Sequence, residues 1–532
     1  MKKKPPNVLI FMVDQLSAFA LRAYGGTVCK TPHLDQLMSH GTVFENTYTP
    51  YPLCAPARFA MMSGRLPSRI GAYDNGAEFP ASIPTIAHYL RASGYYTCLS
   101  GKMHFVGPDQ YHGFEERLTT EIYPADFSWT PTTHYGDISM DDERRYASGV
   151  STMDTVFDAG PLARSMQMDY DEDVAHCAMR EIYRIARSDD QRPFFLTVSL
   201  THPHDPYVTT QKFWNLYSDD EIGSPTVGFI PLQDRDPHSH SLYFHYGQDK
   251  VDVTDHHLRR ARRGYYAMVS YIDDLFGQIQ SALDNSGLSD DTVILFTSDH
   301  GDMLGERGMW FKKTLFEPAI RIPLILSSPG QTAKRVKTPV TLVDILPTIL
   351  ELTGVQDDFE QIPMDGHSFM SELDTSTLDA PSQQDTLDHE NRPPGKPVFV
   401  EHIDGGTIAP RLMVRNGNYK YVYSRAYPPQ LYDLSQDPNE LNSRAGDPEL
   451  SDIESVLFEL IRENWNIDRL GDEVAADQAA RRVVESALSK GRQEIWDFQP
   501  RPQIHNTHYV RRGDSFPDCE RRGYLSYPES ES

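Results

Sequence analysis

Residues 7–15 read Asn-Val-Leu-Ile-Phe-Met-Val-Asp-Gln, a short apolar run that stops abruptly at a carboxylate. Short runs rich in β-branched and aromatic residues, with polar residues at their ends, are typical of buried parallel strands. Four more runs of this kind follow along the chain, at 95–100, 193–200, 292–298 and 323–328. Segments with the periodicity of helices lie between the runs, at 82–93, 171–187 and 257–285.

Strands that alternate with helices predict an α/β domain with a mostly parallel central sheet flanked by helices. Ligands of such sheets bind outside the carboxyl ends of the strands. The polar residues that follow the apolar runs include Asp14, Lys102, His202 and Asp299. We therefore expect these side chains to converge at one edge of the sheet and to contribute to a functional site.

The chain changes character after about residue 355, where the alternation of strands and helices ends. Strand-like runs at 397–403, 411–415 and 419–424 lie close together, and Asn416-Gly417-Asn418 is typical of a hairpin turn. A helical segment follows at 452–468, and the charged remainder contains Trp496, Tyr509 and Tyr524, which favours packing on another subunit. We therefore predict a large α/β domain (1–370), a polar linker or loop (371–396), a small antiparallel α+β subdomain (397–470) and a C-terminal tail (471–532).

Composition excludes several classes of partner. The 532 residues include 50 Lys and Arg against 76 Asp and Glu, a formal net charge of −26 that repels nucleic acids and anionic membranes. No run approaches the roughly 20 apolar residues that a membrane-spanning helix needs. The basic start leads into a stretch too short for a signal peptide. Five cysteines without paired spacing suit a reducing cytoplasm, where we expect the protein to reside.

Two motifs carry the chemistry. The first is Cys54-Ala-Pro-Ala-Arg58, continued by Ser63-Gly64, and the second is Gly94-Tyr-Tyr-Thr-Cys-Leu-Ser-Gly-Lys102-Met-His104. Together they resemble the two signatures of the type I sulfatases in the alkaline-phosphatase-like superfamily, which implies that fold for the large domain. The alternative interpretation of Cys54 is a buried, small apolar residue.

The resemblance implies a nucleophile that is made after translation. A formylglycine-generating enzyme would oxidise Cys54 to the aldehyde formylglycine, whose hydrate carries two hydroxyl groups. One hydroxyl attacks sulfur, and the second expels sulfate as the aldehyde re-forms, which is covalent catalysis with a built-in release step. The substrate class implied is a small-molecule sulfate monoester.

The resemblance also implies a divalent metal ion. Its ligands would be Asp14, Gln15, the diol at residue 54, Asp299 and His300, with Ca²⁺ favoured and Mg²⁺ or Mn²⁺ as alternatives. Many sulfatases have a second Asp at the position of Gln15. An Asp-Gln pair is familiar from choline-sulfatases and phosphonate monoester hydrolases, so the resemblance favours these two groups within the superfamily. An Asp at a strand end can otherwise be an ordinary turn residue.

Positive residues in the motifs match the negative charge of a sulfate ester. Lys102 and Lys312, the latter in Gly308-Met-Trp-Phe-Lys-Lys313, would hold the sulfate oxygens. Arg58 would hold the diol and the metal. Lys313 is the weaker candidate, because adjacent residues on one element face apart.

Histidines are the candidates for proton transfer. His104 could accept the proton whose removal lets the intermediate release sulfate. A histidine of Thr201-His-Pro-His204-Asp-Pro would protonate the leaving alcohol. Motif position favours His204 over His202, and for either residue the alternative is a loop histidine satisfied by the backbone.

Several further stretches are similar to choline-sulfatases, and three residues match the positions that surround the substrate's quaternary ammonium: Trp129, Glu401 and Asp497. An ammonium without N–H groups is selected by aromatic faces and diffuse negative charge. In that family the acid of the tail comes from a neighbouring subunit, which implies a homo-oligomer, a dimer or tetramer. The Trp-Tyr-His run of that family is absent from Asp141–Ser148, so either Tyr146 and nearby acids substitute or the alcohol differs. The similar stretches are Tyr73–Glu78, 103–120, Ile122–Trp129 and Ile495–Pro500.

These observations predict a sulfuric ester hydrolase that acts on choline-O-sulfate or a similar cationic ester. The first alternative is a promiscuous arylsulfatase or phosphonate monoester hydrolase of the same superfamily. A remote alternative is an inactive scaffold that binds osmolytes.

Overall fold

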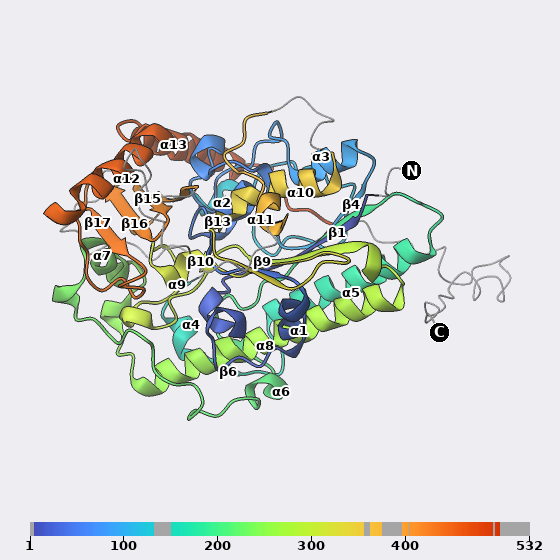
Figure 1. Ribbon diagram of the computed structural model, residues 1–532, viewed down its shortest axis with the longest axis horizontal. Coiled ribbons are helices and arrows are strands. Elements are labelled where there is room, and N and C mark those ends of the chain that lie inside the picture. Colours follow the sequence, from blue (N-terminus) through green and yellow to red (C-terminus); the bar gives the residue numbers. More distant parts are fainter. Residues whose placement is uncertain are drawn as a thin grey trace.

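Strand β1 (Asn7–Val13) lies inside an eight-stranded sheet in the computed structural model of the chain (Figure 1). It pairs in parallel with β9 (Thr292–Ser298) on one side and with β7 (Phe194–Ser199) on the other. The predicted mostly parallel sheet is confirmed. The strand order is β12 (Lys334–Val336), β2 (Thr42–Phe44), β11 (Leu324–Ser327), β9, β1, β7, β4 (Tyr96–Gly101) and β5 (Glu116–Arg117). The structure describes residues 5–131, 151–355, 362–374, 396–403, 405–492 and 495–500.

One predicted strand runs the opposite way. The run at 323–328 forms β11, which pairs antiparallel with both β9 and β2. The segment between β9 and β11 remains at the carboxyl end of the sheet, where it carries His300 and Lys312. The chain therefore re-enters the sheet from that edge, and β11 must run antiparallel to β9.

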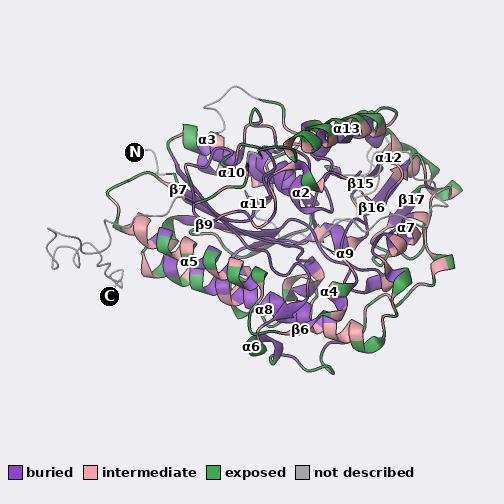
Figure 2. Ribbon diagram, turned by 180° about the vertical axis from the view of Figure 1, so that it is seen from behind, coloured by how far each residue is buried: buried purple, intermediate pink, exposed green. Residues whose placement is uncertain are grey.

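Both faces of β1 are buried, which explains its continuous apolar sequence. Leu9 and Phe11 pack toward the helices of one face, whereas Val8 and Ile10 pack toward those of the other, as the alternation of side chains along a strand requires. In Figures 1 and 2 the helices form a layer on each side of the sheet. One layer contains α1 (Pro32–His40), α5 (Met166–Arg187) and α8 (Asp255–Asn285), and the other α2 (Cys54–Ser63), α3 (Ile86–Ala92) and α10 (Ile345–Thr353).

Shorter elements complete the large domain. A three-stranded sheet and a two-stranded sheet are formed by residues that are distant in sequence. The three-stranded sheet contains β10 (Arg321–Ile322), β3 (Thr47–Tyr48) and β13 (Val340–Thr341), and the two-stranded sheet β6 (Gly160–Pro161) and β8 (Val208–Thr209). The short helices are α4 (Asp154–Phe157), α6 (Gln211–Trp214), α7 (Pro237–His245), α9 (Glu317–Ile320) and α11 (Met370–Asp374).

The C-terminal region contains the predicted antiparallel sheet, with four strands, and α12 (Ser451–Asn464) packs on it. Gly417 has a φ of 58° at the hairpin, a conformation that glycine adopts without strain. The buried ammonium of Lys420 pairs with Glu317 at 3.0 Å and with Glu440 at 2.6 Å, which joins this sheet to the large domain. The strands are β14 (Val398–His402), β15 (Arg411–Asn416), β16 (Tyr419–Ser424) and β17 (Gln430–Asp433).

The tail expected from residue 471 begins instead with a helix, α13 (Leu470–Leu488), which lies beside α12 in Figure 1. Its buried residues recur at helical spacing, but two of the four are polar, so the sequence reads as a solvated segment. The Arg481 guanidinium donates two hydrogen bonds, both of 2.8 Å, to the buried carboxylate of Asp74, and a third of 3.0 Å to Thr130 Oγ1. Gln478 donates to the same carboxylate at 2.9 Å. These contacts fix α13 on the large domain.

A short piece of the tail lies against its own chain. Trp496 packs edge-on against Phe127, and the Asp497 carboxylate accepts a hydrogen bond of 2.9 Å from the Ala125 N–H. Within the described ranges, no helix combines the length and the apolar character needed to cross a membrane. Several predictions concern residues outside those ranges: Asp141–Ser148, most of the linker, Tyr509 and Tyr524.

Arg481→Ala should lower the free energy of unfolding by about 3–5 kcal/mol, because it leaves the buried Asp74 carboxylate without its positively charged partner. Urea denaturation followed by tryptophan fluorescence measures the change. The matched control is Arg462→Ala, which removes an exposed pair with Glu459 and should cost less than about 1 kcal/mol. Equal, small losses of stability in both variants would show that the clamp on Asp74, the pair of hydrogen bonds from Arg481, contributes little to the free energy of unfolding.

Candidate active site

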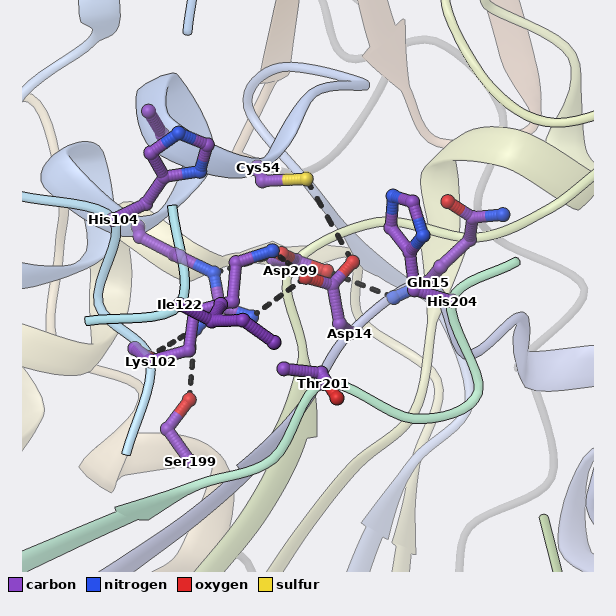
Figure 3. Close-up of polar contacts among 12 residues, drawn as sticks. Asp14, Gln15, Cys54, Lys102, His104, Ile122, Ser199, Thr201, His204 and Asp299 are labelled. Atoms are coloured by element: carbon purple, nitrogen blue, oxygen red, sulfur yellow. Dashed lines mark hydrogen bonds and ion pairs between the residues drawn. The ribbon is translucent and has the colours of Figure 1, made fainter. Parts of the chain in front are cut away.

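The candidate site lies at the carboxyl ends of the parallel strands, as the sequence predicts (Figure 3). Asp14 follows β1, Lys102 follows β4, and Asp299 follows β9, and all three side chains are fully buried. The Asp14 N–H donates to the His202 carbonyl at 3.2 Å, which ties β1 to the segment after β7. The adjacency of parallel strands thus brings together residues that are hundreds of positions apart.

Arg58 joins these strand ends from helix α2. Its Nε donates to Asp299 Oδ2 at 2.8 Å, and Nη2 donates to Asp14 Oδ2 at 3.3 Å. Nη1 donates to the Lys102 carbonyl at 2.6 Å and to Ser199 Oγ at 2.8 Å. The guanidinium therefore contacts the ends of four strands, and it is fully buried.

Cys54 is the first residue of α2, so its side chain lies at the positive end of the helix. Its Sγ is 3.3 Å from both His300 Nε2 and Lys312 Nζ, and 3.7 Å from Asp14 Oδ1. Burial alone raises the pKa of this thiol. The charges of Lys102, Lys312 and His300 outweigh burial and hold the pKa well below its usual range. This position therefore favours an anionic group.

Four side chains could hold a metal ion. One ligand atom from each of Asp14, Cys54, Asp299 and His300 lies within 4.8 Å of the others, and all four residues are buried. His300 Nδ1 lies 3.0 Å from the Gly301 carbonyl oxygen. If Nδ1 carries the proton for that hydrogen bond, Nε2 retains its lone pair toward the carboxylates, the arrangement typical of histidine ligands. The donor set fits a divalent cation.

Gln15 is held with its amide in one orientation. Its Nε2 donates to Asp302 Oδ2 at 2.7 Å and to Asp205 Oδ1 at 3.2 Å, while Oε1 accepts a hydrogen bond of 2.8 Å from Lys312 Nζ. Because the same ammonium contacts Cys54, the Gln15 carbonyl oxygen faces the candidate metal group. Gln15 has a φ of 68°, a conformation that is uncommon outside glycine.

The two candidate lysines contact the site from different elements. Lys102 Nζ forms a close ion pair with Asp14 and lies 4.3 Å from the centre of the Tyr123 ring. Burial lowers the pKa of Lys102, but Asp14 and Cys54 outweigh it and raise the pKa above its ordinary value. Lys312 contacts Gln15 and Cys54, as described above. Lys313 faces apart from this pair, with its Nζ 3.4 Å from His245 Nε2.

Both ring nitrogens of His104 are buried, and the ring lies near the Cys54 thiol, which acts on its pKa. The φ of His104 is 59°. Its backbone N–H donates a hydrogen bond of 2.8 Å to Glu121 Oε2, which supports this backbone conformation. Burial lowers the pKa of His104, which favours the neutral imidazole. The ring packs beside Tyr123 and Trp129, with centroid distances of 5.0 and 5.5 Å.

The two histidines after β7 have different surroundings. His202 Nδ1 lies 2.6 Å from the buried Asp171 carboxylate, which also accepts the backbone N–H of His202. His204 Nδ1 lies 2.7 Å from the Asp205 carbonyl oxygen. Burial and Lys312 lower the pKa of His204, but Asp205 and Asp14 outweigh them and raise it. Charged residues of the site therefore act on His204. His202 is instead held by the buried carboxylate of Asp171.

The structure brings together only part of the predicted ammonium site. Trp129 lies beside His104, and Asp497 contacts Ala125 in the segment that leads to Trp129. Glu401 does not join them. Its carboxylate accepts hydrogen bonds from the Ser68 N–H and, at 2.7 Å, from Trp465 Nε1, and burial raises its pKa to about 7.

Several residues of the site carry no signal of their own in the sequence. Tyr123 lies in a stretch that marks the family, but nothing in the sequence shows its contact with Lys102. Asp205 directly follows the predicted acid His204, and Asp302 lies shortly after the predicted ligand His300. This proximity in sequence is the signal that could have suggested them. Glu121 supports His104 only through the backbone.

Comparisons with known proteins agree with this geometry. The family model for "Sulfatase" matches residues 6–355. The model described as "N-sulphoglucosamine sulphohydrolase, C-terminal" matches 305–466, and that described as "Choline sulfatase enzyme C terminal" matches 472–523. The last range includes most of α13, so this helix lies within the segment that the choline-sulfatase C-terminal model matches.

Similar proteins include a choline-sulfatase of Rhizobium meliloti (strain 1021), which is 42% identical over 537 residues covering 99% of both chains. Iduronate 2-sulfatase of Homo sapiens is 31% identical over 345 residues, 62% of this chain and 60% of the relative. The crystal structure of a phosphonate monoester hydrolase of Agrobacterium radiobacter matches with a TM-score of 0.66 at 22% identity, over 86% of this chain and 95% of that chain. This last likeness concerns the fold. The chain therefore belongs to the sulfatase family, as a choline-sulfatase-like sulfatase.

Proposed function

We propose that the protein hydrolyses sulfate monoesters of a small cationic alcohol, with choline-O-sulfate as the favoured substrate and residue 54 as the nucleophile. The observation that carries the proposal is the position of Cys54. It begins α2 and belongs to the candidate metal group, with Lys312 Nζ 3.3 Å from its sulfur. The choline-sulfatase of Rhizobium meliloti, at 42% identity, supports the substrate.

The proposed nucleophile is a formylglycine made from Cys54 by a maturation enzyme. Its hydrate attacks sulfur through one hydroxyl and releases sulfate through the other. The buried environment that stabilises an anion at residue 54 also stabilises a deprotonated hydroxyl there. Arg58 holds Asp14 and Asp299 in place around this group.

A divalent metal ion completes the proposed site, and Ca²⁺ is favoured because most of the donors are hard oxygens. Asp14, Asp299, His300 and the group at residue 54 would hold it, and the Gln15 carbonyl oxygen faces the same space. When bound, the metal supplies positive charge that polarises the sulfate and the nucleophilic hydroxyl.

The proposed proton and charge transfers use residues that surround Cys54. Lys102 and Lys312 hold sulfate oxygens as the bond to the alcohol breaks. His104, which burial keeps neutral, accepts the proton that releases sulfate. His204, whose pKa is raised, protonates the departing alcohol.

The proposed ammonium site consists of Trp129 and Asp497. The Trp129 ring lies nearly perpendicular to the His104 ring, and the Asp497 carboxylate contacts Ala125 in the segment that leads to Trp129. We leave Glu401 out, because both of its oxygens accept hydrogen bonds within the protein. In this structure Asp497 reaches the segment from its own chain, and a homo-oligomer built through the tail remains part of the proposal.

A phosphonate monoester hydrolase is the second candidate, because the Asp14-Gln15 pair is equally compatible with that group. The rates for choline-O-sulfate, an aryl sulfate and a phenylphosphonate ester, measured on one preparation, separate the two functions. The proposed function requires the highest kcat/KM for choline-O-sulfate.

Cys54→Ala should reduce turnover of choline-O-sulfate below about one part in a thousand, because a covalent nucleophile is lost. The mass of the peptide that contains residue 54 should be about 18 Da lower in the active protein than the sequence requires, since –CH₂SH becomes –CHO. The matched control is Cys98→Ala, which removes another fully buried thiol and should retain activity. Activity well above that level in Cys54→Ala would identify a different nucleophile.

His204→Ala should slow the hydrolysis of esters with poor leaving groups by about 10²- to 10⁴-fold and that of activated aryl sulfates far less. The measurement is kcat/KM across aryl sulfates whose phenols differ in pKa. His202→Ala is the control, and any loss there should be equal across the series because His202 acts through the fold. A uniform loss in His204→Ala contradicts the proton-donor role.

Asp497→Asn tests the ammonium site, because asparagine can still accept the hydrogen bond from the Ala125 N–H while it removes the charge. KM for choline-O-sulfate should rise several-fold, and Trp129→Leu should raise it by about 2- to 30-fold, the range of a cation–π contact. KM for a neutral aryl sulfate is the control and should change little. Equal changes for both substrates would assign these residues to structure alone.

A further inference from the structure

Tyr123 lies beside Lys102 at the candidate site, although no motif identifies it. Its ring centroid is 4.3 Å from Lys102 Nζ and 5.0 Å from the His104 ring. The His204 ring lies 6.4 Å away and the Trp129 ring 4.9 Å away. The ring therefore packs against every proposed proton-transfer residue and against the proposed ammonium site.

The hydroxyl of Tyr123 is buried, and the described part of the chain offers it no hydrogen-bond partner. Buried polar groups are almost always paired, and leaving one unpaired costs stability. Burial, together with the negative charges of Asp14 and Cys54, raises the pKa of Tyr123 well above its usual range. The phenol therefore keeps its proton at neutral pH and can donate a hydrogen bond to an anion.

The residues around the ring are those of the candidate site. Lys102 lies over the ring, and the proposed proton-transfer residues His104 and His204 lie beside it. The ring thus borders the space in which the lysines would hold a sulfuryl group. A sulfuryl group bound there has three oxygens that do not lead to the alcohol, and each needs a donor or a cation.

We propose that Tyr123 is a further catalytic residue, whose hydroxyl donates a hydrogen bond to one of these sulfuryl oxygens beside Lys102 and Lys312. This inference rests on the proposed function. The donor is neutral, so it adds hydrogen bonding without further repulsion between the lysines. The covered face of the ring also keeps water away from Lys102, which strengthens the interaction of that ammonium with the sulfate.

Tyr123→Phe removes only the hydroxyl and is the decisive variant. In the mature, metal-loaded enzyme, kcat/KM should fall about 10- to 100-fold, the usual effect of losing a hydrogen bond to a charged group. The fall should be similar for choline-O-sulfate and for aryl sulfates of every leaving group, because the contact is to the sulfuryl group. The urea midpoint of unfolding should stay equal or rise, because the variant removes an unpaired buried hydroxyl.

Tyr95→Phe is the matched control, because Tyr95 is also buried but donates to the Pro6 carbonyl far from the site. It should keep full activity. Binding of inorganic sulfate, measured by calorimetry, gives a readout that does not depend on turnover, and Tyr123→Phe should weaken it about 10-fold or more.

Two results would overturn the inference. One is a Tyr123→Phe enzyme within about twofold of the parent in kcat/KM and in sulfate binding, well below the effect of a lost charged hydrogen bond. The other is a loss confined to poor leaving groups, which would place the donor on the alcohol oxygen. If the parent enzyme cleaves no sulfate ester, the proposed function fails, and sulfate binding alone then decides whether Tyr123 contacts the anion.

Discussion

The site brings charges together where water cannot reach them. Arg58, Lys102 and Lys312 contribute three cations, and Asp14 and Asp299 contribute carboxylates, all within a fully buried cluster. Charges removed from water are costly unless each is paired and hydrogen-bonded. The guanidinium of Arg58 meets this requirement by contacting both carboxylates as well as two strand ends. The positions of the proposed nucleophile and of the candidate metal ligands follow from this pairing.

The sheet supplies these groups in a fixed geometry. Parallel strands end at one edge, so each strand contributes a side chain to the same space without a long loop. Strand β11 runs antiparallel to its neighbour β9 and is compatible with this geometry. The segment between β9 and β11 crosses the same edge of the sheet and carries His300 and Lys312. Cys54 enters from the other direction, at the first turn of α2, where the helix adds its own positive end.

The sequence predicted the parts of the molecule that local patterns determine. Apolar runs located β1, β4, β7 and β9, and the motif around Cys54 located the family. Beyond the convergence of the strand ends, individual contacts between distant segments could not be predicted. The contact between Tyr123 and Lys102 exists only in the folded protein. Two of the residues on the buried face of α13 are polar, so its sequence does not resemble that of a packed helix. Glu401 contacts Trp465 because the C-terminal sheet packs there. The direction of β11 likewise depends on the path of a loop that has no strong pattern of its own.

The clamp between α13 and the large domain has a consequence for biosynthesis. Asp74 and Arg481 are separated by 407 positions, and the same guanidinium contacts Thr130, which follows Trp129 in the sequence. Until residue 481 has left the ribosome, the strands of the large domain can pair, but Asp74 lacks the guanidinium that neutralises it. Pairings between such distant segments form late, since the intervening chain must first be ordered. A product terminated before Arg481 is therefore left with an acid that is costly to bury, which disfavours the folded segment around Asp74.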